Sequence, residues 1–112
     1  MAYRRGEVVL VPFPFADARA TKVRPAFVLS DRSYEAETGN VIVAQITSQA
    51  AQFSSDRALR DWREAGLKHP SIVRLKLATL AAALVRYSPG AVTPRERDLG
   101  AVEIALAAIL RI

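Results

Sequence analysis

Short apolar runs separated by polar segments fill the first half of the chain, a pattern that is typical of buried β-strands. These runs predict strands at about residues 7–11, in the run that follows Arg24, and from residue 41 to about residue 46. The first strand should end at Pro12, because proline cannot donate a hydrogen bond to a neighbouring strand. Residues 12–23 are then predicted as a connecting loop.

The middle of the chain is more polar. Residues 31–40 predict a turn that ends in Gly39-Asn40, and residues 49–70 form a longer polar segment. Within that segment, residues 56–65 suit a short helix that would pack Leu59 and Trp62 on one side. Gly66 would stop this helix.

Apolar and basic positions then alternate over residues 71–77. Val73, Leu75 and Leu77 are expected on one face of a strand and Arg74 and Lys76 on the other, because successive strand side chains point to opposite faces. Residues 80–87 favour a further strand, although the three alanines there would also suit a helix.

The C-terminal segment predicts a helix. In Thr93-Pro94-Arg95-Glu96 the threonine can cap the helix, the proline suits the first helical position and the glutamate completes a capping box. Helical spacing relates Leu99, Val102, Leu106 and Ile109. The opposite side carries Ile104 and several alanines, so the helix is expected to touch a second surface, most simply that of a dimer partner.

Composition narrows the class of protein. The chain has 112 residues, and we expect a single domain over residues 1–112. The hydrophobic fraction of 51% argues against disorder, and no apolar run is long enough to span a bilayer. The chain has no cysteine, which excludes a disulfide framework and a thiolate metal site. The first residues lack the apolar stretch of a signal peptide, so a cytoplasmic location is expected.

The formal charge of +5 comes from 13 arginines and 3 lysines against 11 acidic residues. The planar arginine fork matches phosphate and stacks on bases, so this excess favours a nucleic-acid or acidic-protein partner. A solvated basic surface would explain the same charge equally well.

Two polar residues lie at the edges of predicted strands. Arg24 opens Arg24-Pro25-Ala26-Phe27-Val28, and Thr47 closes Val43-Ala44-Gln45-Ile46-Thr47. In one sheet, this cation and this hydroxyl could converge on a phosphate where the strands meet a loop. Together with the opening Gly6-Glu7-Val8-Val9-Leu10-Val11-Pro12, and with Ser71-Ile72-Val73-Arg74 further on, this order resembles the PemK/MazF family of toxin endoribonucleases from toxin–antitoxin pairs. The resemblance covers most of the chain.

The resemblance implies a β-rich fold with a C-terminal helix, an SH3-like small barrel of the CcdB/PemK toxin type. It also implies the toxin of a type II toxin–antitoxin system, which cleaves single-stranded RNA and thereby inhibits translation and growth. Such toxins usually form homodimers and use no metal or other cofactor. A cognate antitoxin protein neutralises them, and DNA is contacted only indirectly through that antitoxin. No membrane partner is expected.

Metal-free RNA cleavage requires attack by the ribose 2′-hydroxyl on phosphorus, stabilisation of the added charge and protonation of the departing oxygen. A histidine pair is excluded because His69 is the one histidine, and we interpret it as a surface residue. The resemblance makes Arg24 and Thr47 the catalytic candidates. Arginine stays charged, so Arg24 suits electrostatic stabilisation better than proton transfer, although the family gives the matching arginine an acid–base role. Thr47 would donate a hydrogen bond to the scissile phosphate.

Structural roles remain open for both residues. Arg24 could instead be held by Glu7 or Asp31, and Thr47 could satisfy backbone groups at a strand end. The candidate RNA-binding residues are Phe15 for base stacking and Lys22, Ser48, Arg74 and Lys76 for the backbone. Each of them has an ordinary alternative in core packing, turn formation or a solvated face. The loop that would cover the site has no glycine between Gly6 and Gly39, unlike the usual glycine-containing loop of the relatives.

Two other functions compete. The related gyrase-poisoning toxins share the barrel but act on a protein through their C-terminal helix, so a non-catalytic binder of a target such as DNA gyrase is the main alternative. Arg24 and Thr47 favour the nuclease, because a gyrase binder does not need them. An adaptor for proline-rich peptides would need an aromatic-lined groove, and the three tyrosines and one tryptophan are scattered.

Overall fold

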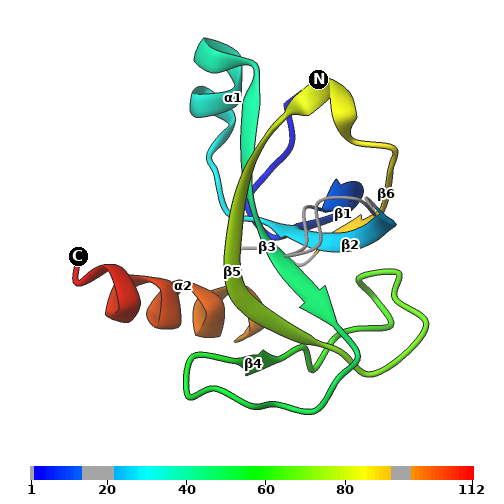
Figure 1. The fold of residues 1–112 in the computed structure, drawn as a ribbon, viewed down its shortest axis with the longest axis vertical. Coiled ribbons are helices and arrows are strands. Elements are labelled where there is room, and N and C mark those ends of the chain that lie inside the picture. The colour runs from blue at the N-terminus through cyan, green and yellow to red at the C-terminus, as the bar shows by residue number, and fades with distance from the viewer. Residues whose placement is uncertain (1, 14–21, 92–96) are drawn as a thin grey trace.

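The computed structural model describes residues 2–13, 22–91 and 97–112. Its elements are β1 (Glu7–Phe13), β2 (Lys22–Val28), α1 (Arg32–Thr38), β3 (Asn40–Thr47), β4 (Arg57–Ala58), β5 (Ile72–Ala81), the 3₁₀ turn η1 (Ala82–Leu84), β6 (Tyr87–Ala91) and α2 (Arg97–Leu110). Within these residues one antiparallel sheet has the strand order β4-β5-β3-β2-β1-β6. The sheet curls into a half-barrel, and α2 lies beside it near β4 (Figure 1).

Both faces of the sheet are buried. One cluster joins Val8, Phe27 and Val73 to Leu99 and Val102 of α2. The other cluster lies on the opposite face and includes Val9, Val11, Ala26, Val28, Val41 and Val43. Successive residues such as Val8 and Val9 therefore alternate between two apolar environments, which explains why the strands read as continuous apolar runs. The three main predicted strands are confirmed.

The predicted end of the first strand at Pro12 is wrong, because β1 continues through Pro12, which pairs with Val23, to Phe13. The described pairing of β1 with β6 stops at Leu10. Pro12 thus has a strand neighbour on one side among the described residues, and an edge position tolerates the missing N–H. Lys22 and Val23 likewise belong to β2 and not to a loop, whereas residues 14–21 lie outside the described part of the chain.

The predicted polar turn over residues 31–40 contains the short helix α1. Asp31 caps it by accepting hydrogen bonds from the N–H of Ser33 (3.0 Å) and from its hydroxyl (2.6 Å). Gly39 ends it with φ of 73°, a left-handed conformation that glycine adopts without steric cost. No residue of α1 is buried, so the helix carries no apolar periodicity from which it could have been predicted.

The predicted helix over residues 56–65 is also wrong, because β4 and a turn occupy this segment. The buried Asp98 at the start of α2 accepts the N–H groups of Arg60 (2.9 Å) and Asp61 (2.8 Å), so these amides are satisfied by a distant carboxylate. The predicted packing is nevertheless confirmed, since Leu59 is buried and Trp62 packs against the same cluster.

The alternation predicted for residues 71–77 breaks at a bulge. Gln45 of β3 pairs with Arg74, and the residue before it in β3, Ala44, pairs with Leu77. Two extra residues of β5 therefore lie between these two pairs. A bulge changes the direction in which the following side chains point. Leu77 is 39% exposed, whereas Val73 is fully buried. The strand predicted over residues 80–87 is interrupted by η1, and β6 begins only at Tyr87.

The C-terminal helix is confirmed as α2, whereas the predicted cap at residues 93–96 lies outside the described residues. Leu99 and Val102 are buried, and Leu106 packs against their cluster. Ile104 and Ile109 are 71% and 46% exposed, so much of the apolar surface of α2 faces outward. No helix among the described residues is long and apolar enough to cross a membrane.

Candidate active site

A cavity of about 700 Å³ opens at one end of the sheet, where β2 begins and β3 ends. Its wall includes Arg24, Thr47 and Ser48, three of the residues singled out in the sequence. The opposite wall comes from residues 66–69 and from the first residues of β6. The structure thus brings the two catalytic candidates into one cavity.

Strand register explains why Arg24 and Thr47 lie together. Ala26 of β2 pairs with Gln45 of β3, and the two strands are antiparallel. Continuing that register by two residues puts Arg24 opposite Thr47, on the same face as Ala26 and Gln45. On its other side Arg24 is paired with Val11 of β1, which is fully buried. A packed sheet therefore fixes the backbone beneath both side chains.

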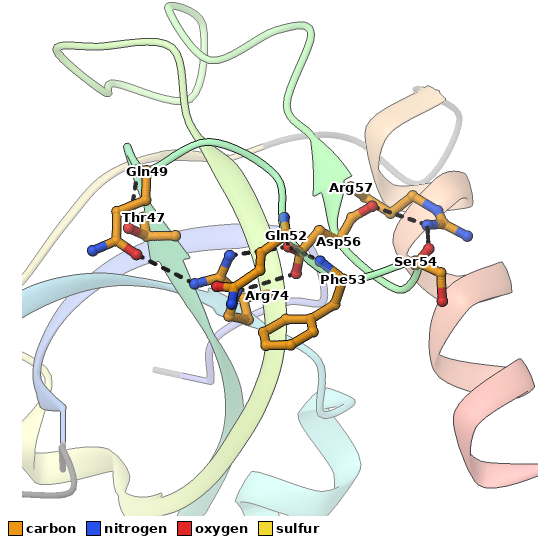
Figure 2. Close-up of polar contacts among 8 residues, drawn as sticks. All are labelled: Thr47, Gln49, Gln52, Phe53, Ser54, Asp56, Arg57 and Arg74. Atoms are coloured by element: carbon orange, nitrogen blue, oxygen red, sulfur yellow. Dashed lines mark hydrogen bonds and ion pairs between the residues drawn. The ribbon is translucent and has the colours of Figure 1, made fainter.

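The Thr47 hydroxyl has a defined local partner. Its Oγ1 accepts the backbone N–H of Gln49 at 3.2 Å, an interaction in which threonine turns the chain at the end of a strand (Figure 2). A hydroxyl can donate one hydrogen bond while it accepts others. Thr47 thus makes the hydrogen bond to the backbone that its structural role would require. The hydroxyl can still donate its proton to a ligand.

Ser48, Lys22 and Lys76 are exposed, but only Ser48 is among the residues described as lining the cavity. Phe15 lies outside the described residues. Phe13, the aromatic residue two positions before it, is 1% exposed in the core. Of the carboxylates that the sequence offered as structural partners of Arg24, Glu7 accepts hydrogen bonds from Ser88 and from the backbone of Arg4, and Asp31 caps α1.

Arg74 has a structural partner that the sequence did not indicate. Its Nε and Nη2 donate to the two carboxylate oxygens of Asp56 at 3.2 and 3.0 Å (Figure 2). The exposed fraction of the side chain is 13% for Arg74 and 0% for Asp56. This hydrogen bonding lowers the pKa of Asp56 to about 2 and raises the pKa of Arg74. A guanidinium bound in this way argues against the predicted contact between Arg74 and an RNA phosphate.

Three residues of the cavity wall were missed or given another role in the sequence analysis. Lys68 and Tyr87 were not singled out, and His69 was interpreted as a surface residue. His69 is exposed as predicted, but it lines the cavity with Arg24 and Thr47. No local pattern marks these residues, because they come from a turn and from the start of β6.

Two glycines bring these segments together. A Cβ atom on Gly66 would lie 2.6 Å from the carbonyl oxygen of Pro89, and one on Gly90 would lie 2.6 Å from the backbone of Ala65. Only glycine permits backbones to approach this closely, and Gly66 also has φ of 81°. The turn that carries Lys68 is therefore held directly against β6.

The charge of the cavity favours an anion. Arg24 and Lys68 contribute cations, and none of the described residues in its wall is acidic. Among residues 2–13, 22–91 and 97–112, no three or more histidine, cysteine or acidic side chains are grouped so that they could hold a metal ion. The arrangement can bind a phosphate between a guanidinium and a hydroxyl, with polar side chains and an exposed tyrosine ring around it.

The sequence profile of the family described as PemK-like, MazF-like toxin of type II toxin-antitoxin systems matches residues 4–110. None of the curated protein sequences matches the chain.

Solved structures share the fold. The crystal structure of MazF (Form-I) from Deinococcus radiodurans is 24% identical, covers 100% of this chain and 99% of its own, and has a TM-score of 0.77. An endoribonuclease in complex with its cognate antitoxin from Mycobacterial species is 20% identical over 99% of this chain and 95% of its own, with a TM-score of 0.76. The Mycobacterium tuberculosis toxin MazF-mt6 is 18% identical over 95% and 97%, with a TM-score of 0.74. At these identities the similarity establishes the fold, and it confirms the predicted β-rich toxin barrel with a C-terminal helix.

Proposed function

Because this chain belongs to the family of PemK-like, MazF-like toxins of type II toxin–antitoxin systems, we propose that it is an endoribonuclease that cleaves single-stranded RNA. Cleavage of mRNA would inhibit translation and growth. The observation that carries the proposal is the placement of Arg24 and Thr47 in one cavity whose described wall has no acidic residue. Structures with this fold include a protein described as an endoribonuclease.

The proposed reaction is an in-line displacement at phosphorus. The 2′-oxygen attacks the adjacent phosphorus and loses its proton, the bond to the 5′-oxygen breaks, and that oxygen takes up a proton. The products are a 2′,3′-cyclic phosphate and a 5′-hydroxyl. The guanidinium of Arg24 stabilises the negative charge that builds up on the phosphorane oxygens, and the Thr47 hydroxyl donates a hydrogen bond to one of them.

The surrounding residues suit a nucleotide chain. Lys68 offers a positive charge for a flanking phosphate, and Tyr87, which is 62% exposed, offers a ring on which an unpaired base can stack. Ser48 adds a hydroxyl beside Thr47. Lys22 and Lys76 lie on the surface outside this wall, where they can attract RNA without contacting the scissile phosphate.

The proposed mechanism uses no metal or other cofactor. Its support is the sequence, which has no cysteine and one histidine, and the chemistry itself, because attack by the 2′-hydroxyl supplies the nucleophile without a metal-bound water.

The proposed partners follow from the family and from α2. A cognate antitoxin would neutralise the toxin, as the complexes of related folds suggest, and would provide the only contact with DNA. The exposed apolar residues of α2 support a homodimer. A cytoplasmic location is proposed, since mRNA is the substrate.

The test is cleavage of a defined single-stranded RNA by the purified protein, with cut ends mapped by primer extension. Cutting should persist in excess EDTA. Loss of cutting on chelation that Mg²⁺ or Mn²⁺ restores would reject the metal-free mechanism. If a protein with intact fold cuts none of a panel of mixed-sequence RNAs, the proposed nuclease fails and the non-catalytic binder of a protein target such as DNA gyrase takes its place.

A further inference from the structure

The Asp56–Arg74 ion pair holds the segment that follows β3. Oδ2 of Asp56 also accepts the backbone N–H groups of Gln52 (2.8 Å) and Phe53 (2.9 Å), which closes a turn on the carboxylate. The ring centroid of Phe53 lies 5.1 Å from the guanidinium carbon of Arg74. The position of Arg74 is therefore set by a buried carboxylate and by an aromatic ring at once.

The same guanidinium reaches the candidate active site through one residue. Nη1 of Arg74 donates to Oε1 of Gln49 at 3.4 Å, and the backbone N–H of Gln49 donates to Oγ1 of Thr47 (Figure 2). Gln49 thus carries two contacts, one from its side chain to the ion pair and one from its backbone to the Thr47 hydroxyl. The bulge in β5 directly after Arg74 separates this end of the strand, which is paired with Gln45–Thr47, from the rest of β5.

We propose that Arg74, fixed by Asp56, is a positioning residue that holds the Thr47 hydroxyl in place through Gln49. The inference rests on the proposed function of the cavity that contains Arg24 and Thr47. A hydroxyl that donates to a phosphorane oxygen is most effective when its orientation is set before the reaction, because no reorganisation is then needed at the transition state. The N–H of Gln49 sets that orientation only while residue 49 is itself held.

An arginine is suited to this task. Its planar group offers donors on two sides, so Asp56 can bind one edge while Nη1 points to Gln49. A lysine would keep the charge but offers no second, rigidly placed edge. This explains why Arg74 is largely buried on a face of β5 from which the sequence predicted contact with RNA.

Gln49→Ala tests the link without breaking the ion pair. The exposed Gln49 side chain can be removed while the N–H of residue 49 remains. We expect kcat for cleavage of a short RNA to fall about 10-fold, with KM changed less than about twofold, because the loss is one of orientation and not of binding. The matched control is Gln52→Ala, in the same segment, where only the backbone makes a hydrogen bond among the described residues. It should leave both constants unchanged.

The Thr47→Ala background separates positioning from direct contact with RNA, since Gln49 also lines the cavity. If Gln49 acts through the Thr47 hydroxyl, Gln49→Ala should have no further effect once that hydroxyl is absent. If it contacts RNA itself, KM should rise and the loss should persist in the double variant. The second result would overturn the inference while leaving the proposed nuclease intact.

A second measurement needs no RNA. Amide hydrogen exchange at residue 49, followed by NMR, should accelerate in Arg74→Lys and in Gln49→Ala but not in Gln52→Ala. Unchanged exchange in the first two variants would overturn the positioning role. If the wild type cuts no RNA, both the proposed function and the catalytic part of this inference are rejected. The exchange data then decide separately whether Arg74 holds this strand end.

Discussion

At the scale of single residues, the proposed function depends on two side chains whose chemistry is complementary. Arg24 supplies a permanent charge and Thr47 supplies a directed hydroxyl, and both line one cavity. Sequence could select these residues because the segments that carry them, Arg24 before a proline and Thr47 at the end of an apolar run, resemble those of the family. It could not select Lys68, His69 or Tyr87, since their approach to the site depends on the turn that ends at Gly66.

Arg24→Lys should lose most cleavage but keep the fold and much of the affinity for RNA. Lysine retains the charge, yet it loses the planar fork that can contact two phosphate oxygens, so the transition state is weakened more than the ground state. Cleavage rates and the Kd for a non-cleavable RNA would be compared, with folding checked by circular dichroism. Near-wild-type cutting would place the site elsewhere.

Thr47→Ala should lower turnover by roughly 10- to 1,000-fold, the range expected for one hydrogen bond made in the transition state. Thr47→Ser should recover part of this loss, because the hydroxyl survives. Single-turnover cleavage of the same RNA measures both variants. A serine variant no better than the alanine variant would contradict the assigned role of the hydroxyl.

The ionisation of Asp56 should make the free energy of unfolding decrease at acidic pH. The Arg74 hydrogen bonds lower its folded-state pKa to about 2 from an ordinary 3.8, so its stabilising contribution is complete above about pH 4 and is lost as pH falls toward 2. Asp56→Asn should destabilise the protein by about 3 kcal/mol at neutral pH, because a largely buried guanidinium loses its counter-charge. Denaturant unfolding should show the gap between wild type and variant closing between pH 4 and pH 2. A gap that does not change with pH would contradict this account.

At the scale of elements, the candidate site depends on the contact between a turn and a short strand that are distant in the sequence. The turn before β5 and the strand β6 meet at Gly66 and Gly90, where their backbones lie in close contact. Neither the helix predicted over residues 56–65 nor the strand predicted over residues 80–87 would have produced this contact. The cavity wall thus comes from the region in which the sequence prediction failed.

Gly90→Ala should destabilise the protein by about 1–3 kcal/mol, because its Cβ would overlap the backbone of Ala65 and force the two segments apart. The matched control is Gly100→Ala, at a position in α2 where a Cβ would meet nothing within 4 Å. That change should stabilise the helix by up to about 1 kcal/mol. Thermal unfolding of both variants measures these effects, and equal Tm values would reject the close approach.

At the scale of the whole molecule, one face of α2 completes the core and another remains open. Leu99 and Val102 are buried, whereas Ile104, Ile109 and Leu110 are 71%, 46% and 50% exposed. Apolar surface of this kind on a short chain favours association, and a second copy is the simplest occupant. Residue spacing alone predicted that this helix touches a second surface.

The protein should therefore be a homodimer of about 24 kDa, twice the 12.2 kDa of the chain. Ile104→Glu should shift it toward the monomer, because the charge would be desolvated in the interface. Leu84→Glu, at an exposed apolar position of η1, is the control and should remain dimeric. Sedimentation at micromolar concentration measures both. A wild type that sediments only at 12.2 kDa would reject the dimer.

The sequence by itself determined the strands of the core and the helix α2, and it indicated Arg24 and Thr47 as the candidate pair. The spacing of apolar residues and the residue types are local properties of the chain. A strand buried on both faces gives a continuous apolar run, and a helix buried on one side gives apolar residues at helical spacing. It also determined the family, because the order of these segments is characteristic even where each motif is common.

The tertiary structure decided which groups interact across long distances in the sequence. Arg74 alternates with apolar residues as a solvent-facing strand residue would, yet it binds Asp56, 18 positions away, and Gln49, 25 positions away. Asp98 likewise satisfies amides 37 and 38 positions distant. Such choices depend on contacts between segments that are distant in the sequence, and these contacts leave no periodic signal. For this physical reason the sequence could not show that Arg74, a candidate for contact with RNA, forms an ion pair with Asp56.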